Sequence, residues 1–348
     1  MKILITGNLG YIGPVLSEYL NKNYLIGYDA GFFHKNSIFK KNKKDKNINN
    51  QIFGDIRKIK KKDLNKVDAV IHLAAISNDP MGNQFIKATE EINVIATKRL
   101  IKLCIASKVK SFVFASSCST YGNSARKNNP KKEFSFLNPL TYYAKSKVKI
   151  ENFAKKINLK NMNFTSLRFS TACGVSSKIR MDLVMNDFVA SAVANKEINL
   201  LSNGKSWRPL IDVKDMCKAM AWAVKRKFDK KNQYLCLNVG RNQNNILISQ
   251  LAYLVKKQFK GKIKVNLNKQ GEVDKRSYKV NFDKYNKLVE KKYKITTSLE
   301  TSIKNLKKFM IKNKFKTKNF RESKFSRLFF LKKLIKEKKI NKNLYWLN

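Results

Sequence analysis

Residues 2–20, KILITGNLGYIGPVLSEYL, contain the strand, turn and helix that decide the fold of this 348-residue chain. The apolar run KILIT predicts a short buried strand, and the apolar spacing after the glycines predicts a helix. Glycines in such a turn allow a sharp change of direction and let a pyrophosphate approach the helix N-terminus. Three glycines often mark only a turn, but their place between strand and helix favours a dinucleotide site. The residues predicted to bind that cofactor here are Gly7, Gly10, Tyr11, Ile12 and Gly13.

The second predicted strand, YLIGYD (24–29), ends in an acidic residue, Asp29. A carboxylate at this position accepts hydrogen bonds from the ribose hydroxyls of a dinucleotide and repels a 2′-phosphate. Asp29 therefore predicts NAD as the cofactor in preference to NADP. The alternative is that Asp29 only caps a helix or stabilises a turn.

Strands and helices continue to alternate as far as about residue 170. Strands are predicted at 51–56, 68–75, 110–117, 163–170 and 234–240, and helices at 85–107 and 141–158. Such alternation is typical of a parallel sheet with helices on both faces. We predict the α/β class, a Rossmann-type doubly wound parallel sheet with a smaller, mixed α/β C-terminal substrate domain. The NAD-binding domain is assigned 1–170, with 210–243 returning to it, and the substrate domain 171–209 and 244–348.

The helix predicted at 141–158 begins TYYAKSK and sets two tyrosines ahead of several lysines. Residues four apart share a helix face, so Tyr143 neighbours Lys147, whereas Tyr142 faces Ser146. An ammonium beside a phenol favours the phenolate and lowers the phenol pKa, which is normally about 10. The spacing predicts Tyr143 as an acid/base near neutral pH, with Lys147 as its partner. The alternative is a surface tyrosine in a lysine-rich protein.

The formal net charge of +50 raises the question of nucleic-acid binding. The basic residues are spread along the chain, and only 11 of the 74 are arginine, the residue that nucleic-acid sites favour. Enrichment in both lysine and asparagine is what an AT-rich coding sequence produces. We therefore interpret the charge as a compositional bias and predict no nucleic-acid partner.

Metal and membrane sites are not predicted. The five cysteines are scattered without a CxxC pair, and only His34 and His72 accompany them, so no zinc-ligand spacing appears. Reduced, mostly buried thiols fit a cytoplasmic protein. No stretch approaches the roughly 18 apolar residues of a membrane span, and the first residues carry no cleavage signal.

The glycine spacing GxxGxxG and the Tyr-x-x-x-Lys helix occur together with GDIR (54–57), HLAA (72–75) and FASSCSTYG (114–122). As a set they resemble the extended short-chain dehydrogenase/reductases, specifically the NAD-dependent nucleotide-sugar epimerase/dehydratase group. The resemblance runs from residue 2 to about 283. It implies Ser117, Tyr143 and Lys147 as the catalytic residues. The further cofactor-binding residues that it implies are Asp55, Ile56, Ala74, Ala75 and Asn93, besides Tyr143 and Lys147.

The substrate half resembles the family more weakly. VMNDFV (184–189), WRPLIDVKD (207–215) and DKRSYKVNFDK (274–284) imply a nucleotide-sugar contact and two arginines at its diphosphate. The family often has asparagine after the sixth strand, where RFST (168–171) places threonine, and this departure leaves the sugar's identity open. The substrate-binding residues implied by the resemblance are Ser117, Ser119, Thr171, Asn186, Arg208 and Arg276.

The reaction implied is hydride chemistry at a sugar carbon, usually C4. Family members that expel the C6 hydroxyl carry an acidic residue directly after the catalytic serine, where this chain has Cys118 and Ser119. Neither is a useful acid/base for water loss at neutral pH. We therefore predict an epimerase, with a 4,6-dehydratase or a 4-reductase as alternatives. The resemblance also implies a cytoplasmic homodimer that makes precursors of cell-surface polysaccharide.

An alternative hypothesis, from another functional class, is that the chain is a non-catalytic basic Rossmann protein or an RNA-associated protein. Such proteins commonly lose the catalytic tyrosine or lysine, and this chain has both. The lysine-rich tail KFSRLFFLKKLIKEKK (324–339) is compatible with a basic amphipathic membrane helix. We predict instead a C-terminal helix packed on the substrate domain.

Overall fold

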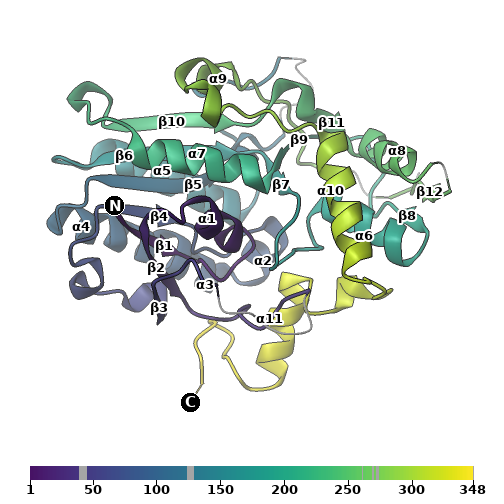
Figure 1. Cartoon of the computed structure of the whole chain (residues 1–348), viewed down its shortest axis with the longest axis horizontal. Coiled ribbons are helices and arrows are strands. Elements are labelled where there is room, and N and C mark those ends of the chain that lie inside the picture. The colour runs from purple at the N-terminus through teal and green to yellow at the C-terminus, as the bar shows by residue number, and fades with distance from the viewer. Residues whose placement is uncertain (39–44, 124–128, 261, 269, 272–273, 348) are drawn as a thin grey trace.

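The computed structural model describes residues 1–38, 45–123, 129–260, 262–268, 270–271 and 274–347, with a seven-stranded sheet at its centre (Figure 1). The strands of this sheet are β1 (Lys2–Thr6), β2 (Tyr24–Asp29), β3 (Asn50–Phe53), β4 (Ala69–His72), β5 (Ser111–Ser117), β6 (Asn163–Phe169) and β10 (Tyr234–Val239). All pair in parallel, in the order β10-β6-β5-β4-β1-β2-β3. Strands β1 to β6 are arranged in the order of a dinucleotide-binding Rossmann sheet, so the predicted fold class is confirmed.

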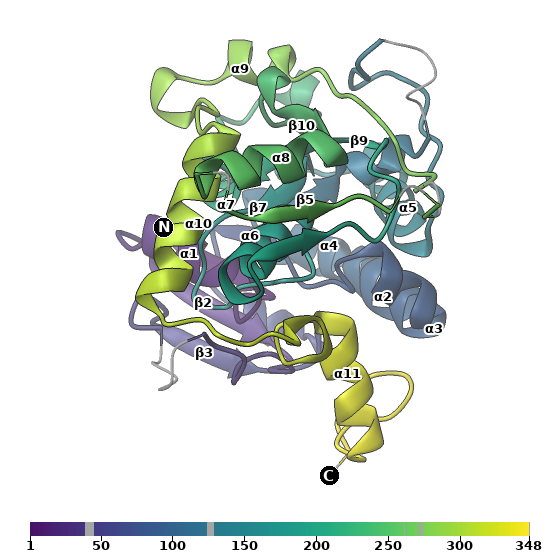
Figure 2. The ribbon, with the colours of Figure 1, turned by 90° about the vertical axis from the view of Figure 1, so that its right-hand side faces the viewer.

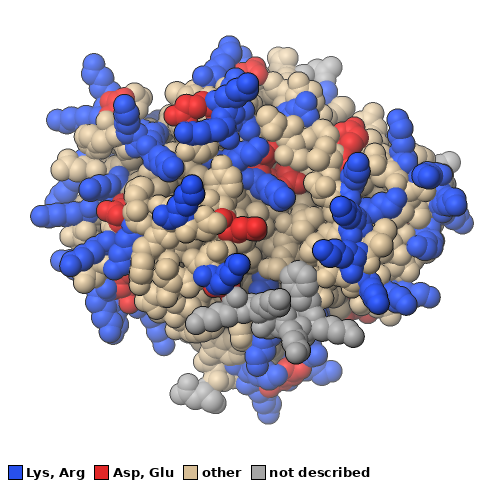
Figure 3. Space-filling view, viewed as in Figure 1, with Lys and Arg blue, Asp and Glu red and all other residues tan. Residues whose placement is uncertain are grey.

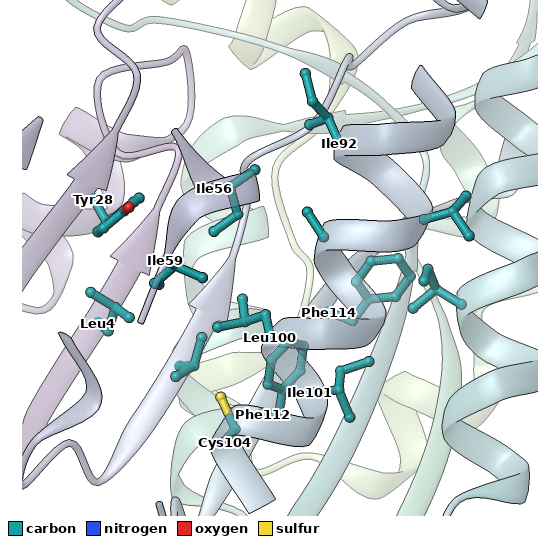
Figure 4. Close-up of a cluster of buried hydrophobic side chains, with 14 of the residues drawn as sticks. Leu4, Tyr28, Ile56, Ile59, Ile92, Leu100, Ile101, Cys104, Phe112 and Phe114 are labelled. Carbon is teal, nitrogen blue, oxygen red and sulfur yellow. The ribbon is translucent and has the colours of Figure 1, made fainter. Parts of the chain in front are cut away.

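Each face of the sheet is covered by helices because the buried strands are apolar on both sides. Side chains alternate between faces along a strand, so Leu4 joins one core cluster while Ile3 and Ile5 join the other. The first cluster packs Phe112 and Phe114 of β5 against helices that include α4 (Thr97–Ala106) and α5 (Tyr142–Lys156). Figure 4 shows this cluster, with the α4 side chains lying over the sheet.

The opposite face carries α1 (Gly13–Tyr19) and α7 (Val213–Lys225), which lie in front of the sheet in Figure 1. Before α4, the predicted helix 85–107 is divided into α3 (Ile86–Thr89) and a π-helical segment (Glu90–Ala96). The short α2 (Asp79–Gln84) precedes them. Irregular π turns of this kind occur frequently at functional sites.

A smaller mixed α/β part lies beside the large sheet and faces the viewer in Figure 2. Its sheets pair β7 (Thr171–Cys173), β9 (Trp207–Asp212) and β11 (Asn245–Leu247), and β8 (Glu197–Asn199) with β12 (Lys264–Asn266). Its helices α6 (Val184–Ala194), α8 (Ile248–Gln258) and α10 (Leu299–Lys312) share one core. The helix α9 (Asp283–Leu288) instead packs on the α7 side of the large sheet through Tyr285.

The predicted packing of the C-terminal helix on the substrate domain is wrong for α11 (Arg327–Lys336). Leu331 and Leu334 of α11, and Ile340 and Leu344 beyond it, belong to the core cluster of the nucleotide-binding sheet. These side chains lie on one helix face and in the turn that follows. Burying each of them contributes about 1.5–3 kcal/mol to the stability of the fold, because apolar surface is removed from water. Figure 1 shows α11, in yellow, below that sheet.

The positive charge is distributed over the surface. Figure 3 shows lysine and arginine side chains around the whole visible face, with acidic residues among them, rather than a single basic stripe. Within the described residues, no helix is both long enough and apolar enough to span a bilayer.

Candidate active site

A cavity of about 650 Å³ opens at the carboxyl ends of the parallel strands. Ligands of doubly wound sheets bind at this edge, because loops after successive strands diverge there. The structure brings together most of the residues implicated by sequence. Those that line the cavity are Gly7, Gly10, Tyr11, Ile12, Asp29, Asp55, Ile56, Ala74, Ala75, Ser117, Ser119, Tyr143, Lys147, Thr171, Arg208 and Arg276.

The glycine turn is closely packed, and at two of its glycines a side chain would collide with neighbouring backbone atoms. Gly7 has φ of +76°, and a Cβ on it would lie 2.6 Å from the Ala74 nitrogen. Gly13 begins α1, where a Cβ would lie 1.8 Å from the Asn8 carbonyl oxygen. Gly13 does not line the cavity. Its part is to let the turn fold back on itself, which leaves the backbone of Gly10–Ile12 facing the cavity.

The two acidic residues predicted at the cofactor differ in their surroundings. Asp29 accepts hydrogen bonds from the backbone N–H groups of Leu9 (3.0 Å) and Gly31 (2.7 Å). Burial raises the Asp29 pKa, and these two hydrogen bonds oppose that rise. Asp55 forms an ion pair with Arg57 at 2.6 Å. The glycine turn leaves no room for a Cβ at Gly7, and the Asp29 carboxylate lies at the end of β2. This arrangement fits the pyrophosphate and ribose of a dinucleotide.

Asn93 lies behind the cavity rather than in it. Its side chain accepts from the Ile76 N–H (2.8 Å) and donates to the Ile76 carbonyl (3.0 Å) and to Ser146 Oγ (3.2 Å). Asn93 therefore ties the loop after β4 to helix α5. In this structure it positions the cavity wall.

Helix α5 orients the two tyrosines as the spacing predicted. Thr141 caps the helix, its Oγ1 accepting from the Ala144 N–H at 3.2 Å. Tyr142 is 44% exposed, whereas Tyr143 is half-buried and lines the cavity. Lys147 Nζ lies 5.4 Å from the centre of the Tyr143 ring and 4.7 Å from that of Phe114.

The predicted lowering of the Tyr143 pKa is wrong. Burial raises the Tyr143 pKa to about 12; the Asp79 charge adds to the rise, while a hydrogen bond with Ser117 and the Arg180 charge oppose it. Burial also lowers the Lys147 pKa to about 7, with the Glu151 charge opposing. For both groups, desolvation by burial is the largest contribution and outweighs the contributions that oppose it.

The serine-rich stretch after β5 presents two hydroxyls and hides one thiol. Ser117 Oγ accepts from the Ser119 N–H at 3.1 Å. Ser119 Oγ is buried at the cavity and has no hydrogen-bond partner among the described residues. Cys118 donates its Sγ–H to the Arg168 carbonyl at 3.1 Å, and burial raises the thiol pKa. Ser119 is thus free to bind a ligand, and Cys118 is not.

The two predicted substrate arginines meet at one carboxylate. Arg208 lies 2.6 Å and Arg276 2.8 Å from Asp274, and Arg276 also pairs with Asp79 at 2.6 Å. All four side chains line the cavity. This pairing keeps two guanidinium groups side by side, which suits a doubly charged ligand.

Asn186 is not brought into the cavity. It is fully buried on α6, where it accepts from the Gly174 N–H (3.1 Å) and donates to the Arg180 carbonyl (2.9 Å) and the Tyr11 hydroxyl (3.3 Å). Its polar atoms are satisfied by the protein, so the side chain organises the loop before α6.

Sequence reasoning missed several charged residues of the cavity. Arg180 donates to Ser77 Oγ at 3.1 Å and pairs with Asp182 at 2.8 Å. Asp79, at the start of α2, accepts from Thr141 Oγ1, which caps α5. Polar residues in the loop between β4 and α2 were a usable signal for Asp79, because the loops after parallel strands gather at one edge of the sheet. Arg327, also in the cavity wall, carried no such signal.

The chain is similar in sequence to a known protein family and to several of its members. The model of the NAD dependent epimerase/dehydratase family matches residues 3–240. The Bacillus subtilis (strain 168) protein named "Uncharacterized UDP-glucose epimerase YtcB" is 28% identical over 236 residues, which cover 63% of this chain and 71% of that protein. The dTDP-D-glucose 4,6-dehydratase of Dictyostelium discoideum is 27% identical over 266 residues, covering 69% and 58%.

Among solved structures, the UDP-glucuronic acid 4-epimerase from Bacillus cereus, in complex with UDP-glucuronic acid and NAD, shares the fold with a TM-score of 0.74. It is 22% identical, and the match covers 90% of this chain and 99% of that one. The family match spans more than half of the chain and agrees with the sequence-based prediction of family and cofactor. This chain is therefore a member of the NAD dependent epimerase/dehydratase family, and its dinucleotide cofactor is NAD.

Proposed function

We propose that this enzyme interconverts the C4 epimers of a nucleotide-diphosphate sugar through a transient 4-keto sugar. The proposal rests on one cavity that is lined both by acid/base residues and by a pair of arginines. Ser117, Tyr143 and Lys147 line it at the strand ends, and Arg208 and Arg276 line it from the smaller part of the molecule. An acid/base group and a diphosphate site within one cavity match a sugar attached to a nucleoside diphosphate.

The chain's own groups handle the proton. Tyr143, as phenolate, takes the proton of the sugar hydroxyl, and Ser117 holds the reacting oxygen by a hydrogen bond. Lys147, next to the Tyr143 ring, stabilises the phenolate once it forms. The hydride acceptor and donor would be supplied by NAD bound along the glycine turn and Asp29, and inversion at C4 would require the hydride to return to the opposite face of the 4-keto sugar. The same Tyr143 then gives its proton back to the carbonyl oxygen.

The arginine pair supports the nucleotide-diphosphate part of the proposal. A planar guanidinium matches two phosphate oxygens at once. Arg208 pairs with Asp274, and the Arg276 hydrogen bond together with the Arg208 and Arg276 charges outweighs burial and holds the Asp274 pKa below its usual range. An incoming diphosphate competes with this carboxylate for both guanidinium groups.

A second candidate function, 4,6-dehydration, is favoured by one observation. Asp79 lies close enough for its charge to raise the Tyr143 pKa, so the cavity does contain a carboxylate near the catalytic tyrosine. Against it, Asp79 is already paired with Arg276 and Thr141. The positions directly after Ser117 hold a buried thiol and a hydroxyl.

The reaction type is tested with a panel of UDP-, dTDP-, GDP- and CDP-sugars, followed by NMR and by absorbance of reduced nicotinamide. We expect epimerisation without added reductant and without net accumulation of reduced cofactor, because each hydride returns to the sugar. A 4-keto-6-deoxy product would contradict the proposal and indicate the dehydratase. A stoichiometric demand for NADH or NADPH would indicate the reductase.

The Asp29→Ala substitution should reduce the preference for NAD over NADP by about tenfold, because it removes a negative charge from the expected place of a 2′-phosphate. Calorimetric titration of both dinucleotides checks this. Asp229→Ala, which removes an exposed carboxylate outside the cavity, is the matched control and should leave the ratio unchanged. Tighter binding of NADP by the unmodified protein would contradict the assignment of Asp29.

The cytoplasmic location, the homodimer, the lack of a nucleic-acid partner and a role in cell-surface polysaccharide synthesis stay predictions. The same holds for the predicted division into an NAD-binding and a substrate-binding domain, and for the roles of individual site residues.

A further inference from the structure

Arg327, the first residue of α11, is a buried cation that forms no ion pair with the residues that the structure describes. Its side chain is only 2% exposed and lines the active-site cavity. Nη2 donates to the Lys178 carbonyl at 3.3 Å, and the guanidinium lies 4.0 Å from the centre of the Phe33 ring. Nη1 has no hydrogen-bond partner within the described ranges. A buried guanidinium that lacks a counter-ion is costly, so its position indicates an anion supplied from outside the chain.

The N-terminal turn of α11 adds a second, independent feature. Ser326 stands at the N-cap without a side-chain hydrogen bond to the helix, and the first turn contains no acidic residue. Residues 326–328 all line the cavity. The free N–H groups at the start of a ten-residue helix favour negative charge, and here they lie next to the unpaired guanidinium.

The charged residues that line the cavity together with Arg327 include Asp29, Arg180 and Asp182. Burial lowers the Arg327 pKa to about 9; the Arg180 charge lowers it further, and the Asp182 and Asp29 charges oppose this. Arg327 is thus near Asp29, at the expected ribose position, and near Arg180, whose charge also reaches Tyr143. In NAD the negative charge lies on the pyrophosphate, between the two ribose groups.

The segment after α11 is fastened to the adenosine end of the same cavity. Trp346 donates its indole N–H to the Ala30 carbonyl at 2.6 Å. Arg57 donates to the carbonyls of Asn343 and Leu344, both at 2.9 Å, and the Tyr345 ring lies 3.3 Å from its guanidinium. These contacts fix α11 relative to the nucleotide-binding sheet.

We propose that Arg327 and the N-terminal turn of α11 bind the pyrophosphate of NAD, so that the C-terminal segment 326–347 forms part of the cofactor site. The proposal depends on NAD as the cofactor and not on the sugar or the reaction. It assigns a ligand to a charge that the fold leaves unpaired.

Binding measurements on cofactor-free protein test it with three probes: NAD, ADP-ribose, which keeps the pyrophosphate, and adenosine, which lacks it. Arg327→Gln should weaken NAD and ADP-ribose by about ten- to a hundredfold, the range for a hydrogen bond to a charged group. Arg327→Lys should weaken them less, and adenosine should be unaffected. Lys332→Gln, on an exposed position of the same helix, is the matched control and should change none of the three.

Three outcomes would overturn the proposal. Equal losses for adenosine and ADP-ribose would mean that Arg327 only supports the fold. NADP and UDP, titrated alongside these probes, supply the other two: a loss confined to NADP would assign Arg327 to a 2′-phosphate, and a loss confined to UDP would assign it to the substrate.

Hydrogen exchange on the unmodified protein gives a readout that needs no variant. ADP-ribose, but not adenosine, should increase the protection of amides in the first turn of α11, and equal protection would contradict the proposal. None of these experiments uses turnover, so their failure leaves the proposed function standing.

Discussion

Replacing Tyr143 with phenylalanine should reduce the rate of epimerisation by about a hundred- to ten-thousand-fold, the usual cost of removing a general acid/base. The substitution removes only the hydroxyl that takes the proton from the sugar. Tyr143 lines the cavity next to Lys147, whereas Tyr142 is 44% exposed and does not line the cavity. Turnover with a substrate identified from the nucleotide-sugar panel measures the loss.

The matched control is Tyr142→Phe, which should retain close to full activity because its hydroxyl faces away from the cavity. NAD binding by Tyr143→Phe, followed by calorimetry, should remain within a few-fold of that of the unmodified protein, since the phenyl ring still fills its place. Equal loss of activity from the two substitutions would show that the assignment of the catalytic tyrosine is wrong.

Arg168→Met should destabilise the protein by about 3–5 kcal/mol, the largest stability change we expect from one substitution. Arg168 on β6 and Glu151 on α5 are both almost completely buried and lie 2.6 Å apart. Ser116 and Ser166 also donate to Glu151, at 2.6 and 2.9 Å. Without the guanidinium, the Glu151 carboxylate is left charged in an apolar interior, and this uncompensated charge accounts for the loss.

Urea denaturation followed by circular dichroism measures this effect. The double variant Glu151→Leu with Arg168→Met should recover much of the stability, because it removes both charges together. Lys149→Met breaks an exposed pair with Glu90 and should cost less than about 1 kcal/mol. If the double variant were no more stable than Arg168→Met, the loss would come from packing rather than from the unpaired charge.

The link between this pair and the active site is short. Ser116 precedes Ser117, and the Arg168 guanidinium also donates to the Tyr121 hydroxyl at 3.0 Å. The network therefore holds the strand end that presents Ser117, as well as the helix that presents Tyr143 and Lys147. A residual activity defect in the refolded double variant would be expected from looser placement of Ser117.

Local sequence patterns are sufficient to predict the parallel sheet, the glycine turn and the helix face that Tyr143 shares with Lys147. Each of these follows from local patterns: the two-residue period of strands, the 3.6-residue period of helices, and glycine where a Cβ has no room. Because the strands are parallel, their carboxyl ends meet at one edge, and residues directly after them could be placed together without a structure.

The roles of several other groups depend on contacts with distant parts of the chain, which the folded structure reveals. Asn186 is turned into the protein by partners at Gly174 and Tyr11, and Asp79 is held by Arg276. The Tyr143 pKa is raised, not lowered, because the surrounding parts of the fold together remove the phenol from water. Arg327 reaches the cavity from the far end of the chain. No local period encodes such contacts, since desolvation and charge act through space and not along the sequence.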